Sequence, residues 1–377
     1  MAAWWVLVAV ASVGLALLGL WRERLRWRAL GKASESHFFS TRDGWEVALH
    51  RYPAKRRRFS VPVILFHGMG SNERVWSLGG EAGWVGQLHR AGYDVWTCSW
   101  RGEGRSRPRF ADVRYAWGWP VQAWIEEDLP ALWGGVLRVT GSPKVHCVGH
   151  GLGGRLLFEA LKVRANPTVL TCTLLGVGKA PKIPASRWFG RMEWLFFWPY
   201  FPWSGLAIGL RVILWAVCRL RGWKWGFAET RSPNIALMRR WLLAGTEPIS
   251  GPLLRQWLLW QGKSRGFLGE MEEQGSRAIG LVDGDANSDG KEMASQARWL
   301  FVVGDRDLIA PLESVERLLG ELRGGQKQAI CLPLNDSIHA MHYSHLDLLL
   351  SPALQDDFFP LWLRWLEDPE GVSLNEK

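Results

Sequence analysis

The chain has 377 residues and a mass of 42.8 kDa, which fits one large α/β domain with an insertion, or two domains. Its 47% hydrophobic and 22% charged residues exclude a disordered or collagen-like chain. The formal net charge of +10 is compatible with nucleic acid, anionic lipid or an acidic substrate as a partner. Tryptophan is in excess, with 26 Trp against 15 Phe and 5 Tyr, which favours rings at a membrane interface or around an apolar pocket over a mere compositional bias.

Residues 2–21 are predicted to form a transmembrane anchor. No charged side chain occurs before Trp21, and an apolar helix of this length nearly crosses the bilayer core of about 30 Å. A cleavable signal peptide would need positive charge before the run and a small-residue cleavage site after it, and neither is present. The arginines that follow, in a basic linker over residues 22–40, predict a cytoplasmic globular domain. A buried core helix and a signal peptide are the alternatives.

Much of the positive charge lies close behind this apolar run, in two groups. They are Arg22, Arg24, Arg26, Arg28 and Lys32, and then Lys55, Arg56, Arg57 and Arg58. Because no zinc-finger spacing or basic heptad accompanies them, we expect a membrane and not nucleic acid as the partner of this charge. The five cysteines have no CxxC spacing and are interpreted as buried free thiols in a reducing compartment. No cofactor or metal is expected.

Short strands and helices alternate along residues 41–181. Strands are predicted at residues 45–50, 61–66, 93–97, 144–148 and 168–175, and helices at 84–89, 124–139 and 152–164. This order with short loops predicts an α/β fold with a mostly parallel sheet that helices cover on both faces.

Residues 182–297 have a different composition and are predicted to be a helical, Trp-rich lid inserted into the α/β core. Ten tryptophans occur along its helix-like segments, which Pro and Gly residues separate. The apolar stretch at residues 206–217 contains Arg211 and is too short to span a bilayer, so a lid or interfacial helix is favoured. The sheet pattern resumes in residues 298–370, with strands at 299–303 and 329–332 and helices at 312–322 and 354–366.

The motifs that carry chemistry follow the predicted strands, where open α/β sheets bind their ligands. His67-Gly68-Met69-Gly70 follows the strand at 61–66, and the amide of Met69 is a candidate oxyanion donor. Glycines alternate in Arg101-Gly102-Glu103-Gly104, a tight exit from the next strand. Gly149-His150-Gly151-Leu152-Gly153 lies between a strand and a helix with the spacing of a nucleophile elbow, G-x-S-x-G, and its apex is Gly151.

These segments resemble the α/β-hydrolase fold, in the lipase and esterase branch that includes acid lipases and bacterial membrane-anchored esterases. The resemblance covers residues 44–366 and rests on YDVWTCSWRGEGRSR, EEDLPALWGGVLRVTGSPKVHCVGHGLGG, FVVGDRDLIAP and YSHLDLLLSPAL. It implies a serine carboxylic-ester hydrolase that acts on hydrophobic acyl esters or lipids. Asp307 matches the catalytic acid and His345 the base, and the Leu152 amide would be the second oxyanion donor beside Met69. Ser99 stands where the family often has Asp.

The main departure from the family is Gly151, which stands at the nucleophile position. Glycine has no side-chain atom to attack a carbonyl, so no acyl-enzyme can form there. It also relieves the backbone strain of an elbow apex, which costs other residues about 1–3 kcal/mol. The neighbouring His150 is common in the motif and is expected to point elsewhere. Three hypotheses follow: a slow hydrolase in which His345 activates water, an inactive pseudo-hydrolase that binds a lipid or acyl ligand, and a membrane scaffold.

Overall fold

The computed structural model describes seven segments of the chain and a few isolated residues between 4 and 25. The segments are residues 33–110, 118–163, 166–178, 235–262, 297–322, 326–334 and 342–367. Most of the predicted anchor at residues 2–21 and most of the predicted lid at 182–297 therefore lie outside the described residues. Within the segments that are described, no helix has both the length and the hydropathy that crossing a bilayer requires.

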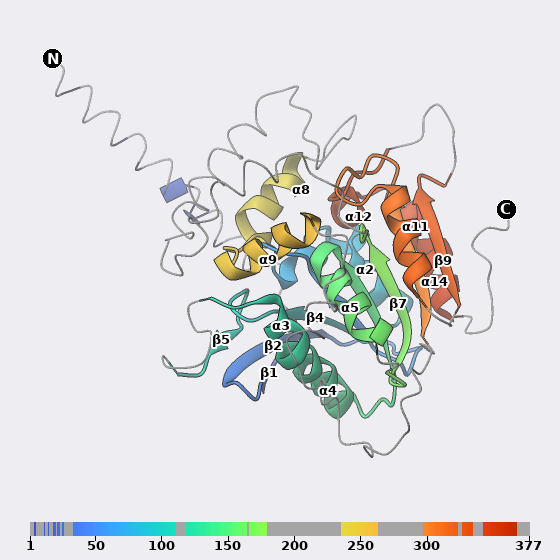
Figure 1. Ribbon diagram of the computed structural model, residues 1–377, viewed down its shortest axis with the longest axis horizontal. Helices are drawn as coiled ribbons and strands as arrows, with labels where there is room; N and C mark the ends of the chain where they lie inside the picture. The colour runs from blue at the N-terminus through green and yellow to red at the C-terminus, as the bar shows by residue number, and fades with distance from the viewer. Residues whose placement is uncertain are drawn as a thin grey trace.

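One sheet of nine strands forms the centre of the described fold (Figure 1). Its parallel strands are β3 (Val63–Phe66), β4 (Val95–Ser99), β6 (Val145–His150), β7 (Val169–Leu175), β8 (Arg298–Gly304) and β9 (Lys327–Leu332). Antiparallel strands β1 (Glu35–Ser40), β2 (Trp45–Tyr52) and β5 (Arg107–Pro108) lie at one edge. The spatial order is β1-β2-β4-β3-β6-β7-β8-β9, with β5 on β2. The prediction of a mostly parallel sheet is confirmed.

Strand β1 occupies residues that the sequence assigned to the basic linker at 22–40. It pairs with β2 along its whole length, from Glu35 opposite Arg51 to Ser40 opposite Glu46. Within β1, the Phe39 side chain packs against the hydrophobic core, whereas Phe38 is 38% exposed. The alternation is too short and too polar to predict a strand by itself, and pairing with β2 supplies the missing hydrogen bonds.

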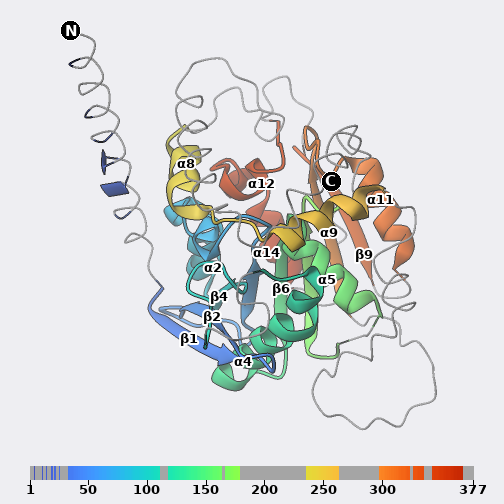
Figure 2. The ribbon, with the colours of Figure 1, turned by 60° about the vertical axis from the view of Figure 1, so that its left-hand side comes forward.

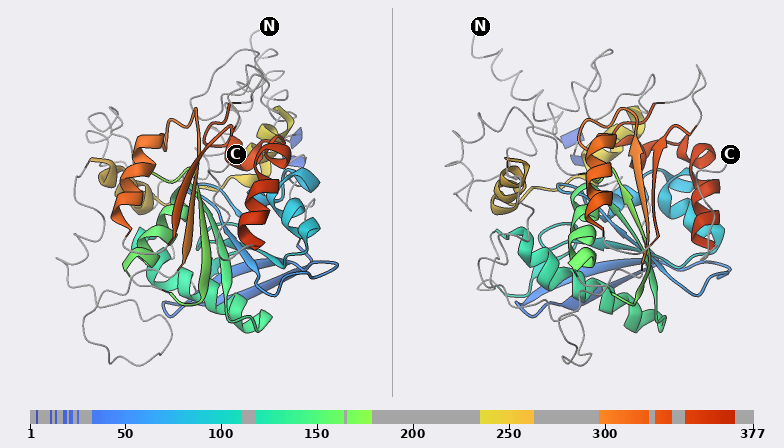
Figure 3. Two further views of the ribbon diagram at one scale, coloured as in Figure 1. Left: turned by 90° about the vertical axis from the view of Figure 1, so that its right-hand side faces the viewer. Right: turned by 45° about the vertical axis from the view of Figure 1, so that its right-hand side comes forward.

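Helices cover both faces of the sheet (Figures 2 and 3). On one face lie α4 (Leu129–Thr140), α5 (Gly151–Val163) and α11 (Leu312–Glu321). On the other lie α2 (Trp84–Ala91), α12 (Asp347–Leu350), α13 (Leu354–Asp357) and α14 (Phe359–Glu367). The helix predicted at 124–139 begins earlier, because α3 (Val121–Ala123) continues through a π-helical turn (Trp124–Asp128) into α4. The predicted terminal helix at 354–366 is divided into α13 and α14.

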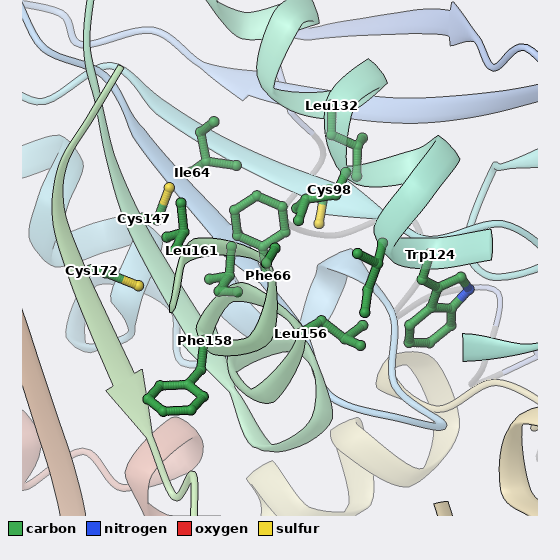
Figure 4. Packing of buried hydrophobic residues seen from close by; sticks show 14 of the residues in the cluster. Ile64, Phe66, Cys98, Trp124, Leu132, Cys147, Leu156, Phe158, Leu161 and Cys172 are labelled. Carbon is green, nitrogen blue, oxygen red and sulfur yellow. The ribbon is translucent and has the colours of Figure 1, made fainter. Parts of the chain in front are cut away.

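The strand side chains alternate between two hydrophobic clusters, one on each face. Ile64 and Phe66 of β3 pack with α4 and α5, and Figure 4 shows Phe66 beside Leu156 and Leu161. Val63 and Leu65 of β3 point to the opposite face, toward the side chains of α2 and α14. The period of two in a strand explains this division. Three of the predicted free thiols lie in this interior, namely Cys98, Cys147 and Cys172.

Tryptophan fills much of the interior of the described fold, whereas most of the tryptophans that the sequence assigned to the anchor and the insertion lie outside the described residues. Among the described residues, eleven tryptophans are buried: Trp45, Trp76, Trp84, Trp96, Trp100, Trp119, Trp124, Trp133, Trp299, Trp362 and Trp365. They form ring contacts such as the stacked pair Trp100 and Trp124, whose centroids are 4.8 Å apart. Large rings bury much apolar area per residue, so a core of this kind uses them without a membrane.

Part of the inserted region is described and packs on the loop after β3. It comprises α8 (Ile235–Arg240), a π-helical turn (Trp241–Gly245) and α9 (Gly251–Gly262). Thr246 forms an antiparallel bridge with Ser71, and the Glu247 amide donates to the Gly70 carbonyl at 2.9 Å. The described residues of the insertion therefore touch the loop between β3 and the two short 3₁₀ turns that come after it, Glu73–Trp76 and Gly80–Ala82.

We predict that Trp362→Ala destabilises the protein by about 3–5 kcal/mol, because it empties a fully buried site. Trp362 is buried between α2 and the sheet, and its Nε1 donates to Thr173 Oγ1 at 3.0 Å. Leu312→Ala at a position 41% exposed is the control and should cost less than about 0.5 kcal/mol. Chemical denaturation measures both values, and equal losses would contradict this description of the core.

Candidate functional site

The turn from β6 into α5 brings Gly151 to the carboxyl end of the sheet. Gly151 has φ +51°, a left-handed conformation that glycine adopts without strain. The neighbouring glycines are needed for close packing: a β-carbon on Gly149 would collide with Gly154, and one on Gly153 would collide with the carbonyl of His67. The sequence therefore folds here into a sharp strand-to-helix turn, as predicted for an elbow.

Asp307 and His345 meet beside this turn. Asp307 follows β8, and its Oδ1 accepts from the amides of Ile309 and Ala310, both at 2.8 Å. Its Oδ2 accepts from His345 Nδ1 at 2.9 Å. Burial alone would raise the pKa of Asp307, but the His345 ring and the two amides outweigh it, so this pKa lies below its usual value. The ionised Asp307 accepts a hydrogen bond from Nδ1, so in the neutral form of His345 the ring proton lies on Nδ1.

The other ring nitrogen of His345 faces the apex of the turn. A β-carbon on Gly151 would lie 3.2 Å from His345 Nε2. Because Nδ1 donates to Asp307, Nε2 of the neutral ring has a free lone pair that can accept a proton. Gly176, with φ +57°, leaves the room that this pair needs, since a β-carbon there would lie 2.7 Å from His345 Nδ1 and 2.9 Å from Asp307 Oδ2.

His150 does not point away from the site, as the sequence suggested, but packs on His345. Their ring centroids are 4.4 Å apart, and the hydrogen bond between His150 Nε2 and the His345 carbonyl is 3.1 Å long. Burial lowers the pKa of His150 to about 3, so His150 is neutral and its Nε2 is the donor. His150 therefore helps to fix the main chain of His345.

The two predicted oxyanion donors belong to segments that touch each other at the elbow. The Leu152 amide is in the first turn of α5, where helix N–H groups are not used inside the helix. Met69 is in the loop after β3, and its neighbour Gly68 packs so closely that a β-carbon there would lie 3.2 Å from both His150 Nδ1 and the His150 carbonyl. The structure thus brings Gly151, His345 and Asp307 together beside both loops, and their catalytic roles stay predictions.

The replacement at Ser99 has a structural explanation that the sequence did not reveal. Ser99 Oγ donates to Glu73 Oε2 at 2.9 Å, and Glu73 also pairs with Arg74 at 2.7 Å. A β-carbon on Gly104 would collide with the Glu73 carboxylate and would come too close to Ser99 Oγ. Glu73, 26 residues earlier in the chain, supplies the buried carboxylate that Ser99 lacks. No sequence spacing connects these two positions, so only the fold could show the exchange.

The sequence analysis also missed a second buried pair, His67 and Glu103. Both side chains are essentially inaccessible, and His67 Nε2 lies 3.6 Å from Glu103 Oε2. Their positions in the HG and RGxG turns were the available signal, but neither turn predicts that the two side chains face each other. Within the described residues, no group of three His, Cys, Asp or Glu side chains has the arrangement of a metal site.

The chain belongs to the alpha/beta hydrolase fold family, whose model matches residues 61–346. Curated relatives include the human lysosomal acid lipase/cholesteryl ester hydrolase, 27% identical over 215 residues, which are 50% of this chain and 53% of that protein. The gastric triacylglycerol lipase of Bos taurus is 30% identical over 156 residues, 37% of each chain. The chain thus spans about half the length, or less, of the curated relatives that it matches. It is a lipase-like or esterase-like member of the family.

Solved structures of low sequence identity share the fold. A hydrolase from Pseudomonas aeruginosa PA01 has a TM-score of 0.54 at 16% identity, covering 89% of this chain and all of that one. A membrane phospholipase A described as a bacterial virulence factor has a TM-score of 0.50 at 15% identity, covering 99% of this chain and all of that one. At these identities the likeness extends to the fold alone.

We predict that Gly176→Ala costs more stability than Gly141→Ala and disturbs His345. Both positions have positive φ, +57° and +66°, but a β-carbon on Gly141 meets nothing within 4 Å. Gly141→Ala should therefore show only the backbone strain of about 1 kcal/mol, whereas Gly176→Ala adds a collision with the His345 and Asp307 pair. Denaturation and the NMR signal of the His345 ring measure the two effects. Equal costs, with an unchanged His345 signal, would disprove the close packing.

Proposed function

We propose that this protein is a lipase-like hydrolase without a serine nucleophile, which hydrolyses hydrophobic acyl esters slowly by direct attack of water. One observation carries the proposal: His345 Nε2 has a free lone pair and faces the space beside Gly151, where a β-carbon would lie only 3.2 Å away. In the family's active members this space holds the nucleophilic oxygen. A water molecule there would be within reach of a base whose other nitrogen is fixed by Asp307.

The chemistry needs no covalent intermediate. His345 Nε2 takes a proton from water as the water oxygen bonds to the ester carbonyl carbon, and negative charge develops on the carbonyl oxygen. The amides of Met69 and Leu152 would stabilise that charge. When the tetrahedral species collapses, the C–O bond to the leaving group breaks, and His345 returns its proton to the departing alkoxide. The products are a carboxylic acid and an alcohol, and the ionised Asp307 stabilises the transient imidazolium.

The rate should be low because the strongest element of such sites is missing. Enzymes that lose a member of the triad keep roughly 10³–10⁴-fold acceleration over water, from the oxyanion donors and substrate binding. The preference for hydrophobic acyl esters is supported by the relatives, which include an acid lipase and a gastric triacylglycerol lipase. The family resemblance alone does not define the length of the acyl chain.

A second candidate is binding of a lipid or acyl ligand without turnover. Gly151 favours it, because a residue with φ +51° would be strained if it were serine, and glycine removes that strain at the cost of the nucleophile. A protein selected only for binding would benefit from that stability. The same site beside Gly151 would hold the ligand in both candidates, so experiments on turnover and binding distinguish them.

We also propose that residues 2–21 anchor the protein in a membrane with the hydrolase domain on the cytoplasmic side. The support is the uncharged run of the sequence followed by Arg22, Arg24, Arg26 and Arg28. An anchor of this kind would hold the site next to a source of lipid substrate.

We predict that Gly151→Ser creates an active-site serine that reacts with a fluorophosphonate and raises turnover of a medium-chain ester by about 10²-fold or more. The new hydroxyl would lie beside His345 Nε2 and become the nucleophile. The same variant should be less stable by about 1–3 kcal/mol, because serine is strained at this φ. Labelling, initial rates and denaturation measure the three effects.

Gly151→Ala is the matched control, since it introduces the same strain and no hydroxyl. It should remain unlabelled, and its residual turnover should fall below that of the unchanged protein because the methyl group occupies the water's space. Adding Asp307→Asn to Gly151→Ser should abolish the gain. If Gly151→Ser shows neither label nor turnover, the hydrolase proposal is wrong. Binding of a fluorescent fatty acid without any turnover would then establish the binding function, and absence of both would leave a scaffold.

For the anchor, we expect the protein to stay with membranes after alkaline carbonate extraction, whereas a variant that lacks residues 2–21 is released. In sealed vesicles of known orientation, protease added on the cytoplasmic side should digest the hydrolase domain. Digestion only from the opposite side would reverse the proposed topology, and release of the full-length chain by carbonate would disprove the anchor.

A further inference from the structure

The buried pair His67 and Glu103 lies directly beneath the loop that contains Met69. The exposed fractions of the two side chains are 0% and 1%. His67 Nδ1 is 3.0 Å from the Gly68 carbonyl, which can only accept, so Nδ1 carries the ring proton. Burial lowers the pKa of His67 to about 4, and the ring is therefore neutral at pH 7. His67 Nε2 is consequently a bare acceptor, and the group that faces it is the Glu103 carboxyl.

The carboxyl group of Glu103 is buried with little to stabilise a negative charge. Both carboxyl oxygens are buried without a hydrogen bond in the described structure, and the nearby Gly70 amide lowers the pKa without forming a bond of ordinary geometry. Burial raises the pKa of Glu103 well above its usual value, and the carboxylate of Glu247 acts in the same direction. A carboxyl group that is buried without a hydrogen bond and faces the bare acceptor His67 Nε2 is favoured in its neutral form, with an O–H to donate.

Several titratable groups surround Glu103, and nearly all of them favour its neutral form. Glu247 belongs to the inserted region, Asp128 to the π-helical turn before α4, and Glu73 to the 3₁₀ turn after the loop, and each carboxylate raises the pKa of Glu103. The Cys98 thiol of β4 lies close enough for Glu103 to raise its pKa. Among the described residues, the groups that act most strongly on Glu103 include no cation that would hold it as half of an ion pair.

The orientation of the Met69 amide depends on the Gly68 carbonyl. The Gly68 oxygen is held from two sides, at 3.0 Å from His67 Nδ1 and by the Ser71 amide at 3.3 Å. In a planar trans peptide the C=O of one residue and the N–H of the next point in opposite directions. Holding the Gly68 oxygen in the interior therefore turns the Met69 N–H away from it, toward the exterior of the loop.

We propose that Glu103 is a positioning residue, which donates its proton to His67 Nε2 and so keeps the Nδ1–H of His67 on the Gly68 carbonyl and the Met69 amide directed at the site. The 3.6 Å separation is longer than a hydrogen bond, and closing it by roughly 0.6 Å would give ordinary N···O geometry. The role of the Met69 amide as an oxyanion donor rests on the proposed function. The positions of the protons on Glu103 and His67 do not depend on that function.

Loss of the Glu103 proton would move the ring proton of His67 from Nδ1 to Nε2. A Glu103 carboxylate attracts the ring proton to Nε2, which leaves Nδ1 as a lone pair facing the lone pairs of the Gly68 oxygen. Two acceptors at 3.0 Å repel, so the Gly68–Met69 peptide would turn and the Met69 N–H would leave the site. The functional arrangement is thus present below the pKa of Glu103 in the folded protein and is lost as the pH rises through it.

The decisive comparison is between the unchanged protein and Glu103→Gln, in full-length chains labelled with ¹⁵N-histidine. The Gln amide has the same shape and donates to His67 Nε2 at every pH. At pH 7 both proteins should show a protonated Nδ1 and a hydrogen-bonded, unprotonated Nε2 on His67, assigned by loss of the signal in His67→Gln. As the pH rises, only the unchanged protein should switch the proton to Nε2. Glu103→Leu should lack the hydrogen-bond shift of Nε2.

Glu159→Gln is the control for removal of a buried carboxylate elsewhere. Glu159 is 1% exposed and pairs with Arg155 on α5, and its substitution should leave the His67 signals unchanged. A doubly protonated His67 at pH 7 would show an ion pair and overturn the proposal. Identical pH titrations of His67 in the unchanged protein and in Glu103→Gln would overturn it as well.

Turnover in the Gly151→Ser background tests the link to Met69 separately. Ionisation of Glu103 should lower kcat by about 10²-fold, the cost of losing one oxyanion donor, and the alkaline loss should be absent when Glu103→Gln is added. If Gly151→Ser has no turnover at all, the proposed function fails, while the His67 spectra still decide whether Glu103 holds the proton. A proton switch without any change in kcat would show that the pair does not position Met69.

Discussion

The site depends on backbone contacts at the turn between β6 and α5. Gly149 lies against Gly154, and Gly153 lies against the carbonyl of His67, at separations that leave no room for a β-carbon. These contacts place the start of α5 beside the loop after β3, so that two sets of free amides share one end of the sheet. The acid and base arrive there from β8 and from the segment before α12, because parallel strands end on the same side. A side chain at any of these glycines would separate the loops.

Two buried carboxyl groups near this turn have pKa values shifted in opposite directions, for reasons that their surroundings explain. Asp307 accepts from two backbone amides and from His345, and these donors more than offset the cost of burial, so its pKa is lowered. Burial raises the pKa of Glu103, and the nearby carboxylates of the described residues act in the same direction, with no hydrogen bond of good geometry to offset them. One group can therefore orient a base through its negative charge, and the other can act on His67 only as a neutral donor. The same fold provides both because the number of donors, and not burial, distinguishes them.

Glycine at position 151 changes the balance between stability and chemistry at the elbow. A serine there would add a nucleophile and also a strained backbone conformation, and the glycine reverses both effects. Gly176 also has a positive φ, and the absence of its side chain leaves the space that the His345 and Asp307 pair occupies. The retention of that space, in a chain without the serine, is the physical ground for considering residual catalysis together with ligand binding.

The acid and base roles of Asp307 and His345 rest on the family resemblance. The amino-acid sequence predicts the alternation of strands and helices, the parallel sheet and the elbow turn from local hydrophobic period and glycine spacing. It did not determine β1, whose short polar alternation becomes a strand only by pairing with β2. Nor did it separate the core tryptophans from membrane ones, since both environments favour the same ring. Only the tertiary structure could decide which distant side chains meet, as in Glu73 with Ser99 and His67 with Glu103. Such pairs depend on the packing of loops from different strands, and no local pattern in the chain encodes that distance.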